Sequence, residues 1–227
     1  TNWENSGEEQ VFDLLDALGN NAMNSLLKAI NEDLLSAQSG KTMLGYQDII
    51  ADAGTGTVGG INSGSSTFWQ NQKYNTSKTF TDQNNNVFDG MLAWNTIIMD
   101  DCRKQGGRNN AIVTTYSIAA AYRTALASAG YGEVSTSNVT GINGPEFPGY
   151  MGAQVVADND CAALHSYMVD TEAIKLRVMK QANFKKTPFV SLQSNGQLAQ
   201  LAYMVAGVQL CTNNRRRSGV ATAITGL

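Results

Sequence analysis

The sequence is poor in the residues on which most enzyme active sites depend. It has one histidine, His165, and three cysteines in 227 residues. A catalytic triad or a Cys–His pair would have to use His165, which lies in the alternating stretch ALHSYMV and is expected to be a half-buried strand residue. We therefore assign no catalytic residue and no cofactor, and we predict a protein that is not an enzyme.

The cysteines and acidic residues also lack the spacing of a metal site. Cys102, Cys161 and Cys211 form neither a CxxC pair nor a Cys/His ligand set, so we expect three reduced, buried thiols. Asp158 and Asp160 resemble the start of a calcium loop, but the glycine at its sixth position and the glutamate at its twelfth are missing. A turn is expected there, and no metal ligand is assigned.

Long apolar runs and a large excess of one charge are absent as well. No run approaches the roughly 18 apolar residues that a membrane helix needs, and TNWENSGEEQ has neither the basic nor the apolar region of a secretory signal. The net charge is −3 and the isoelectric point is near 5.1, which argues against a dedicated nucleic-acid binder. Because Thr1 stands where an initiator methionine would, we expect a processed protein or a sequence that begins partway along a longer chain.

The first 35 residues carry the clearest structural signal. Ser6 and Glu9 form a capping box, and Glu8 adds a second negative charge to the first turn. Apolar residues then recur at three- and four-residue steps, and the stripe includes Leu14, Leu15, Leu18 and Leu26. We predict one continuous helix from about Glu8 to Leu35, about 42 Å long and packed through these leucines.

The rest of the chain alternates between helix and strand patterns. A second helix is expected from Asn86 to Gly106, and a third is expected to start at Ser117 and end at Gly130. Strands are expected at 111–115 and in AQVVAD, LHSYMVD, AIKLRVM and GVATAI, with one long strand in GQLAQLAYMVAGVQLCT. This interleaving predicts an α+β fold.

The loop GTGTVGG contains the spacing G-x-G-x-x-G at Gly54, Gly56 and Gly59. A dinucleotide site needs a helix directly after this turn, to receive the pyrophosphate at its N-terminus. The following INSGSSTFW holds too many turn residues to form that helix, so a surface loop is favoured. A nucleotide-binding enzyme that uses the loop Gly54–Gly60 stays as an alternative.

Three successive arginines, Arg215, Arg216 and Arg217, stand between two strand patterns in CTNNRRRSG. The two asparagines before them and Gly219 after them favour a turn, which predicts a solvated hairpin. A functional role would place the arginines against carboxylates of a neighbouring subunit or against phosphates, and the residues alone leave both open. Replacing all three by glutamine is expected to leave the subunit folded.

Several stretches, taken in order, resemble one branch of the major capsid proteins of tailed bacteriophages, which share the Hong Kong 97-type fold. They are WENSGEEQVFDLL, GYQDIIADAGTGTVGGINSGSSTFWQNQ, NNAIVTTYS, VVADNDC and GQLAQLAYMVAGVQLCTNNRRRSGV. The resemblance spans nearly the whole chain. Its most specific parts are TGTVGGI and FWQNQ, near residues 55–71, and the terminal CTNNRRRSGV.

The resemblance implies a fold with a long spine helix, a peripheral domain with a long β-ribbon, and a mixed α/β axial domain. Residues 1–45 and 181–227 would belong to the peripheral domain, and residues 46–180 mostly to the axial domain. Such proteins usually carry an N-terminal arm and an extended loop before the spine helix. Because the predicted helix starts by about residue 8, we expect a chain that lacks both, either because that region was removed or left out or because this is a shortened variant.

The implied function is structural: a major capsid protein that self-assembles into pentamers and hexamers of an icosahedral shell around double-stranded DNA. The implied location is the virion, after assembly in the host bacterial cytoplasm. The implied partners are other copies of the chain, packaged DNA through non-specific contacts, and the portal, scaffolding or decoration proteins, with no membrane. A phage tail component is the second alternative.

The candidates for subunit-interface residues are Glu8, Glu9, Trp69, Asn71, Arg215, Arg216 and Arg217. In a shell, the arginines are expected to face acidic patches of the next subunit, because complementary charges fix the register of the contact. Sequence-independent binding to the packaged genome is the second option for them.

Overall fold

The computed structural model describes residues 8–75, 94, 97, 102–128, 149–191 and 200–224, which form a mixed helix and sheet protein. The chain divides into two compact units. The first comprises Thr1–Glu32 and Leu176–Gln209, and the second comprises Asp33–Lys175 and Leu210–Leu227. Their assignment to peripheral and axial domains stays a prediction.

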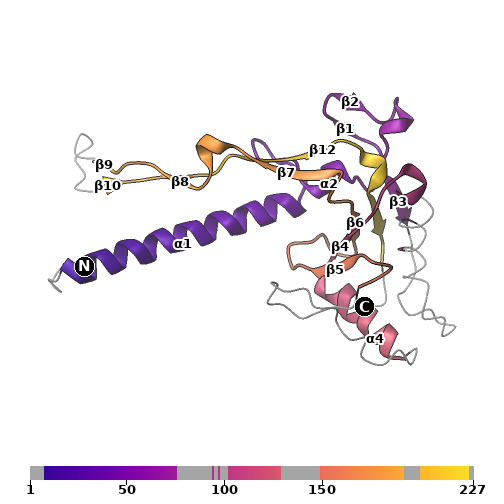
Figure 1. The fold of residues 1–227 in the computed structure, drawn as a ribbon, viewed down its shortest axis with the longest axis horizontal. Helices are drawn as coiled ribbons and strands as arrows, with labels where there is room; N and C mark the ends of the chain where they lie inside the picture. Colours follow the sequence, from indigo (N-terminus) through magenta and orange to yellow (C-terminus); the bar gives the residue numbers. More distant parts are fainter. Residues whose placement is uncertain are drawn as a thin grey trace. The chain divides into compact units, whose positions relative to one another are not determined.

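The helix α1 (Glu8–Leu35) is continuous over 28 residues, with the bounds predicted from its sequence pattern (Figure 1). Gly19 does not interrupt it, and the space around this glycine is open. The expected cap, Ser6, lies outside the described residues. The packing prediction is wrong for Leu18, whose side chain is 56% exposed in the single chain, while Leu14 and Leu15 lie among the side chains that are not described.

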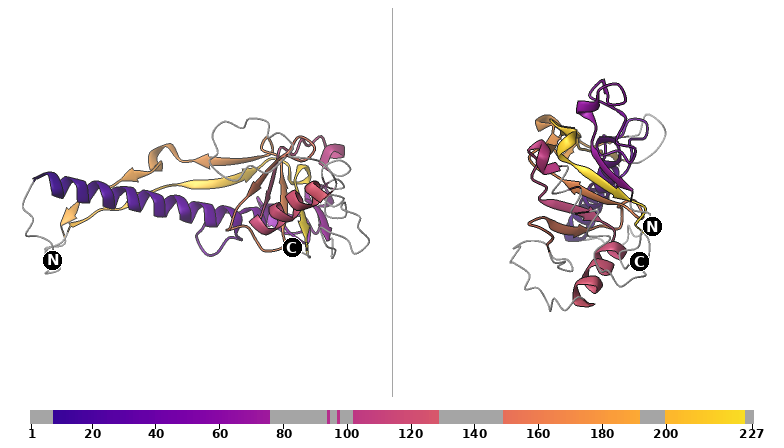
Figure 2. Two further views of the ribbon diagram at one scale, coloured as in Figure 1. Left: turned by 90° about the horizontal axis from the view of Figure 1, so that it is seen from below. Right: turned by 90° about the vertical axis from the view of Figure 1, so that its right-hand side faces the viewer.

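A narrow β-ribbon, here residues 176–209, completes the first unit and runs alongside the helix (Figures 1 and 2). Its described outer pairs are antiparallel. They join β8 (Lys185–Lys186) to β11 (Met204–Val205), and β9 (Val190–Ser191) to β10 (Gln200–Leu201). The strand β7 (Ile174–Val178) pairs with β12 (Val208–Thr212) where the ribbon joins the second unit.

The long strand expected in GQLAQLAYMVAGVQLCT is therefore divided into β10, β11 and β12. The break between β11 and β12 lies at Gly207, whose N–H donates to the carbonyl of Ala182 at 2.7 Å and whose carbonyl accepts from the N–H of Met179 at 2.8 Å. Met179 directly precedes the 3-10 helix η4 (Lys180–Ala182), and Ala182 is the last residue of that helix. The ladder is interrupted because the facing chain makes a helical turn there.

The second unit is built on a five-stranded mixed sheet in the order β3-β13-β6-β4-β5. The strands are β3 (Gln72–Asn75), β4 (Ala111–Thr114), β5 (Gln154–Ala157), β6 (Ser166–Val169) and β13 (Gly219–Thr222). The pairs β3–β13 and β4–β5 are parallel, whereas β6 is antiparallel to both of its neighbours. The predicted strands at 111–115, in AQVVAD, LHSYMVD and GVATAI are confirmed, as is β7 in AIKLRVM.

Both faces of this sheet are covered, because neighbouring strand residues point to opposite sides. Met168 and Ala221 belong to one apolar core, which includes Trp94 and residues of α4 (Tyr116–Ser128). Tyr167 and Val220 belong to the other core, with Ile49 and Leu210. The sheet is thus the middle layer of the second unit.

The third predicted helix is confirmed as α4, with a different start. It begins at Tyr116, and the hydroxyl of Thr115 accepts the N–H of Ile118 at 3.5 Å, so Thr115 caps the helix instead of Ser117. The second predicted helix falls mostly outside the described residues, where Trp94 and Ile97 are the buried positions that are placed. Within the described ranges, no helix is both long and apolar enough to cross a membrane.

Candidate functional site

The three arginines form a short 3-10 helix, η6 (Arg215–Arg217), and not the turn of a hairpin. The hairpin prediction is wrong because the flanking strands belong to different sheets: β12 pairs with β7, and β13 lies between β3 and β6. Asn214 caps the start of this helix, since its Oδ1 accepts the N–H of Arg216 at 3.0 Å. The segment connects the two sheets.

The glycine-rich loop forms a small hairpin next to this helix. Its strands are β1 (Thr57–Val58) and β2 (Ile61–Asn62), and the turn residues Gly59 and Gly60 both have positive φ, at 62° and 78°. Two left-handed residues in a two-residue loop are typical of a hairpin turn and favour glycine. The glycines therefore do not form the strand-to-helix turn that a dinucleotide site requires.

Arg215 is fully buried. Its Nε donates to the carbonyl of Ile49 at 2.7 Å, and its Nη2 donates to the carbonyl of Asp48 at 3.3 Å and to Oδ1 of Asn71 at 3.1 Å. Its Nη1 donates to Oγ of Ser63 at 3.2 Å. These acceptors come from the short helix α2 (Tyr46–Ile49), which precedes the glycine hairpin, and from Ser63 and Asn71, which follow it.

The environment of this guanidinium is polar, with oxygen acceptors on all three of its nitrogens. Among the described residues no carboxylate lies within ion-pair distance of Arg215, so oxygen dipoles alone stabilise the charge. Burial lowers the pKa of Arg215 from its ordinary value, but an arginine remains protonated in a protein. Arg215 is thus an internal cross-link of its own subunit, which differs from the expected solvated turn. The expectation that the subunit would stay folded with glutamine at all three positions overlooked this core residue.

Two other interface candidates also make contacts within the subunit. Asn71 is buried, and its Nδ2 donates to the carbonyls of Ala51 and Gln72 at 2.9 and 3.0 Å, while its Oδ1 also accepts the N–H of Ala51. Trp69 is half-buried, and its indole N–H donates to the carbonyl of Val58 at 3.1 Å. Asn71 and Trp69 thus hold the hairpin segment in place. Their contact with another subunit stays a prediction.

Arg217 pairs with carboxylates of its own chain. Its Nε lies 2.8 Å from Oδ2 of Asp170, and its Nη2 donates to Oε2 of Glu172 at 3.2 Å. Asp170 is fully buried, and its carboxylate also accepts the backbone N–H groups of Arg108 at 3.0 Å and Glu172 at 2.9 Å. The charge of Arg217 is therefore compensated inside the subunit.

Arg216 differs from its two neighbours. Its backbone is anchored, since its carbonyl accepts from Nε2 of Gln72 at 3.3 Å, but its guanidinium has no partner among the residues that the structure describes. It is half-buried. A contact of Arg216 with a carboxylate of another subunit or with a phosphate stays a prediction. Glu8 and Glu9 lie in α1, and their side chains are not described.

The single histidine lies just before β6 and is partly buried, close to the expected half-buried position. Nε2 of His165 lies 3.0 Å from Oδ2 of Asp52, and the other ring nitrogen contacts the carbonyl of Ala163 at 2.5 Å. The imidazole also stacks on the ring of Tyr167, with centroids 6.1 Å apart. His165 therefore joins two loops of the second unit.

Oδ1 of Asp158 accepts the N–H of Asp160 at 2.9 Å, which confirms a turn. Cys102 and Cys161 are buried, but Cys211 is exposed, so the prediction of three buried thiols is wrong for Cys211. It occupies an outward-facing position of β12, between the more buried Leu210 and Thr212. In the described part of the chain, no cluster of three metal-binding side chains occurs.

The fold is similar to that of a solved phage capsid structure, the cyanophage A-1(L) capsid asymmetric unit. The superposition has a TM-score of 0.67 at 17% sequence identity, and it covers 93% of this chain and 70% of the other. No protein-family model and no curated protein matches the sequence. At this identity the likeness is one of fold.

Proposed function

We propose that this chain is a major capsid protein of a tailed bacteriophage, with the Hong Kong 97-type fold. The observation that carries the proposal is the likeness of fold to a cyanophage capsid chain over 93% of the sequence. The stretches GYQDIIADAGTGTVGG and CTNNRRRSGV point to the same family independently of the fold. In this proposal α1 is the spine helix, and the ribbon belongs to the peripheral domain.

The apolar surface of the first unit supports a protein that works among its own copies. Large apolar side chains are exposed along both the helix and the ribbon. They are Leu18, Met23, Leu27, Leu176, Val178, Met179, Phe189, Val190, Leu201, Tyr203 and Val205. Apolar exposure on this scale is typical of an interaction surface. Neighbouring subunits in a shell would remove it from water.

The proposed assembly consists of pentamers and hexamers that close into an icosahedral shell around double-stranded DNA. The virion is the proposed location, and portal, scaffolding or decoration proteins are the proposed further partners. The role of the protein is structural in this proposal. Contacts to DNA would be non-specific, because the chain is acidic overall and any basic surface is local.

Sedimentation and negative-stain microscopy of the purified full-length protein test this proposal. Closed particles, or rings with five or six copies, are the expected result. A protein that stays monomeric at all concentrations and salt conditions would overturn the proposal. In that case a thermal shift on addition of NAD or ATP would favour the nucleotide-binding alternative. Open tubes or trimers would favour a tail component.

A further inference from the structure

Within the first unit, the helix and the ribbon carry opposite charges. Residues 8–32 contain five carboxylates and one lysine, a net charge of −4, and residues 176–209 contain four cations and no carboxylate, a net charge of +4. The carboxylates are those of Glu8, Glu9, Asp13, Asp16 and Glu32, and the cations of the ribbon are Arg177, Lys180, Lys185 and Lys186. This separation is large for a protein with a net charge of −3.

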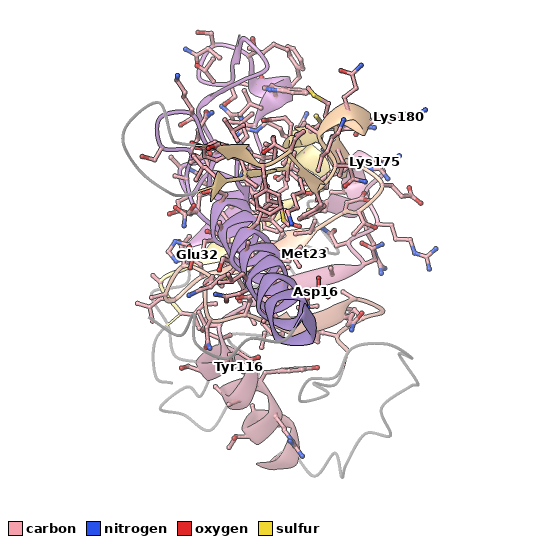
Figure 3. All side chains as sticks on the ribbon, turned by 90° about the vertical axis from the view of Figure 1, so that its left-hand side faces the viewer. Asp16, Met23, Glu32, Tyr116, Lys175 and Lys180 are labelled. Carbon is pink, nitrogen blue, oxygen red and sulfur yellow. The ribbon has the colours of Figure 1, made fainter. Side chains whose placement is uncertain are left out.

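The two carboxylates of residues 8–32 whose side chains are described, those of Asp16 and Glu32, form no ion pair with the ribbon. Glu32 pairs with Lys28 of the same helix at 3.4 Å, and Lys186 lies over the ring of Phe189, 4.6 Å from its centroid. Among the described residues, no ion pair joins α1 to the ribbon. In Figure 3, which looks along the helix, Lys180 lies well clear of α1, and Asp16 and Met23 lie on one side of the helix while Glu32 lies on the other.

Apolar side chains accompany the charges on both surfaces. On the helix, Met23 and Leu27 are exposed and, at 3.6 residues per turn, lie on the same side of the helix as Asp16. On the ribbon, Val190 and Tyr203 are each 62% exposed. An apolar surface among cations fits a protein partner that offers both carboxylates and apolar groups. The acidic face of α1 in another copy offers both.

We infer that the ribbon of one subunit docks on the acidic, apolar face of α1 in a second subunit. The inference rests on the proposed capsid function and names the two surfaces of one contact. Each subunit carries both surfaces, so the contact can repeat from copy to copy, as a ring or shell requires. Complementary charge sets the register, and the apolar side chains are covered when the surfaces meet.

Charge reversal and its rescue test the pairing in the full-length protein. Lys185→Glu with Lys186→Glu, and separately Asp13→Lys with Asp16→Lys, place like charges across the contact. Each pair is expected to lower the yield of particles at least about tenfold at low salt, and combining the two pairs is expected to restore most of the yield. The matched control is Lys41→Glu with Arg123→Glu, which reverses two exposed cations of the second unit and should leave the yield unchanged.

The melting temperature of the dissociated subunits shows whether each variant still folds. Lys185→Gln with Lys186→Gln adds a milder variant, for which a loss of at least about threefold is expected. Normal assembly of both reversal pairs would overturn the inference, as would loss of assembly without rescue in variants that keep the wild-type melting temperature. Normal particles with less nucleic acid would show that the ribbon binds nucleic acid instead. If the wild-type protein forms no particles, the proposed function itself fails.

Discussion

The Nε of Arg215 donates a hydrogen bond to the carbonyl oxygen of Ile49, 2.7 Å away and 166 residues earlier in the chain. Both residues are fully buried. A buried charge is costly unless hydrogen bonds satisfy it, and here four oxygen acceptors do so. The first of the three arginines therefore belongs to the core of the subunit.

We expect Arg215→Gln to destabilise the subunit strongly. Glutamine is too short to reach the oxygens that the guanidinium joins, so several buried acceptors would lose their donors. Each such group costs about 1–3 kcal/mol, which gives a loss of at least about 3 kcal/mol in the free energy of unfolding. Urea denaturation of the dissociated subunit measures this loss.

Arg216→Gln is the matched control, because it removes the same charge one residue later. The guanidinium of Arg216 has no partner among the described residues, so a change within about 0.5 kcal/mol is expected. Equal losses of stability in the two variants would show that the burial of Arg215 does not matter. If Arg216→Gln folds normally but lowers particle yield, Arg216 serves at a subunit interface, and a loss of packaged DNA alone favours a phosphate contact.

Arg217→Gln is expected to have an intermediate effect. It removes the cation beside the buried carboxylate of Asp170, although two backbone N–H groups still bind that carboxylate. A loss of about 2–3 kcal/mol is expected, less than for a fully enclosed pair, because Arg217 is partly exposed. In a double-mutant cycle with Asp170→Asn, a coupling energy above about 1 kcal/mol is expected. Additive losses would argue against the ion pair.

Two glycines give opposite expectations for replacement by alanine. At Gly45 a Cβ would collide with the carbonyl oxygen of Ser36 and lie 2.6 Å from that of Asp33. Neither backbone group moves freely, so Gly45→Ala is expected to cost at least about 2 kcal/mol. Gly19 lies in α1 with open space around it, so Gly19→Ala is expected to stabilise the helix by up to about 1 kcal/mol.

Thermal unfolding of both glycine variants tests these signs. Gly45 has φ of −98°, which any residue adopts, so the predicted cost is steric and not one of backbone conformation. A stable Gly45→Ala variant would mean that the segment from Ser36 to Gly45 is looser than its contacts indicate.

Thiol alkylation should distinguish Cys211 from the buried cysteines. Burial, together with the nearby charge of Asp158, raises the pKa of Cys161 to about 12, so at pH 8 very little of it is the reactive thiolate. Cys211 is exposed. We expect iodoacetamide to label one site rapidly in the folded protein and all three sites in urea, as read by mass spectrometry. Cys211→Ser should abolish the rapid reaction, and rapid labelling of Cys161 would contradict its burial.

Regular elements could be predicted from the sequence because their signals are local. The stripe from Val11 to Ile30 and the acidic first turn place α1, and short β-branched runs place β4 and β5. The ribbon was predicted less well. An alternating pattern favours a strand but does not show what the facing chain does, and the turn at η4 opposite Gly207 divides the predicted strand.

The burial of Arg215 could not be predicted in this way. Its acceptors are mainly backbone carbonyls and small polar side chains, and these carry no distinctive pattern in the sequence. They lie 144 to 167 residues away. Three consecutive arginines instead suggest an exposed surface. Asn71 is an interface candidate because it lies in FWQNQ, a stretch that resembles the capsid family. In the structure its Oδ1 accepts a hydrogen bond from Arg215 of the same chain.

The position of β13 in its sheet determines when the subunit can finish folding. β3 is connected to the rest of the sheet through β13, because β13 lies between β3 and β6. In the sequence, however, β13 follows β3 by more than half the length of the chain. Likewise, Oγ of Ser63 and Oδ1 of Asn71 gain the guanidinium of Arg215 as a donor only when that residue has been added to the chain. During synthesis the segment from α2 to β3 therefore stays incomplete until residues 215–222 have emerged, and a chain that stops before them cannot complete its second unit.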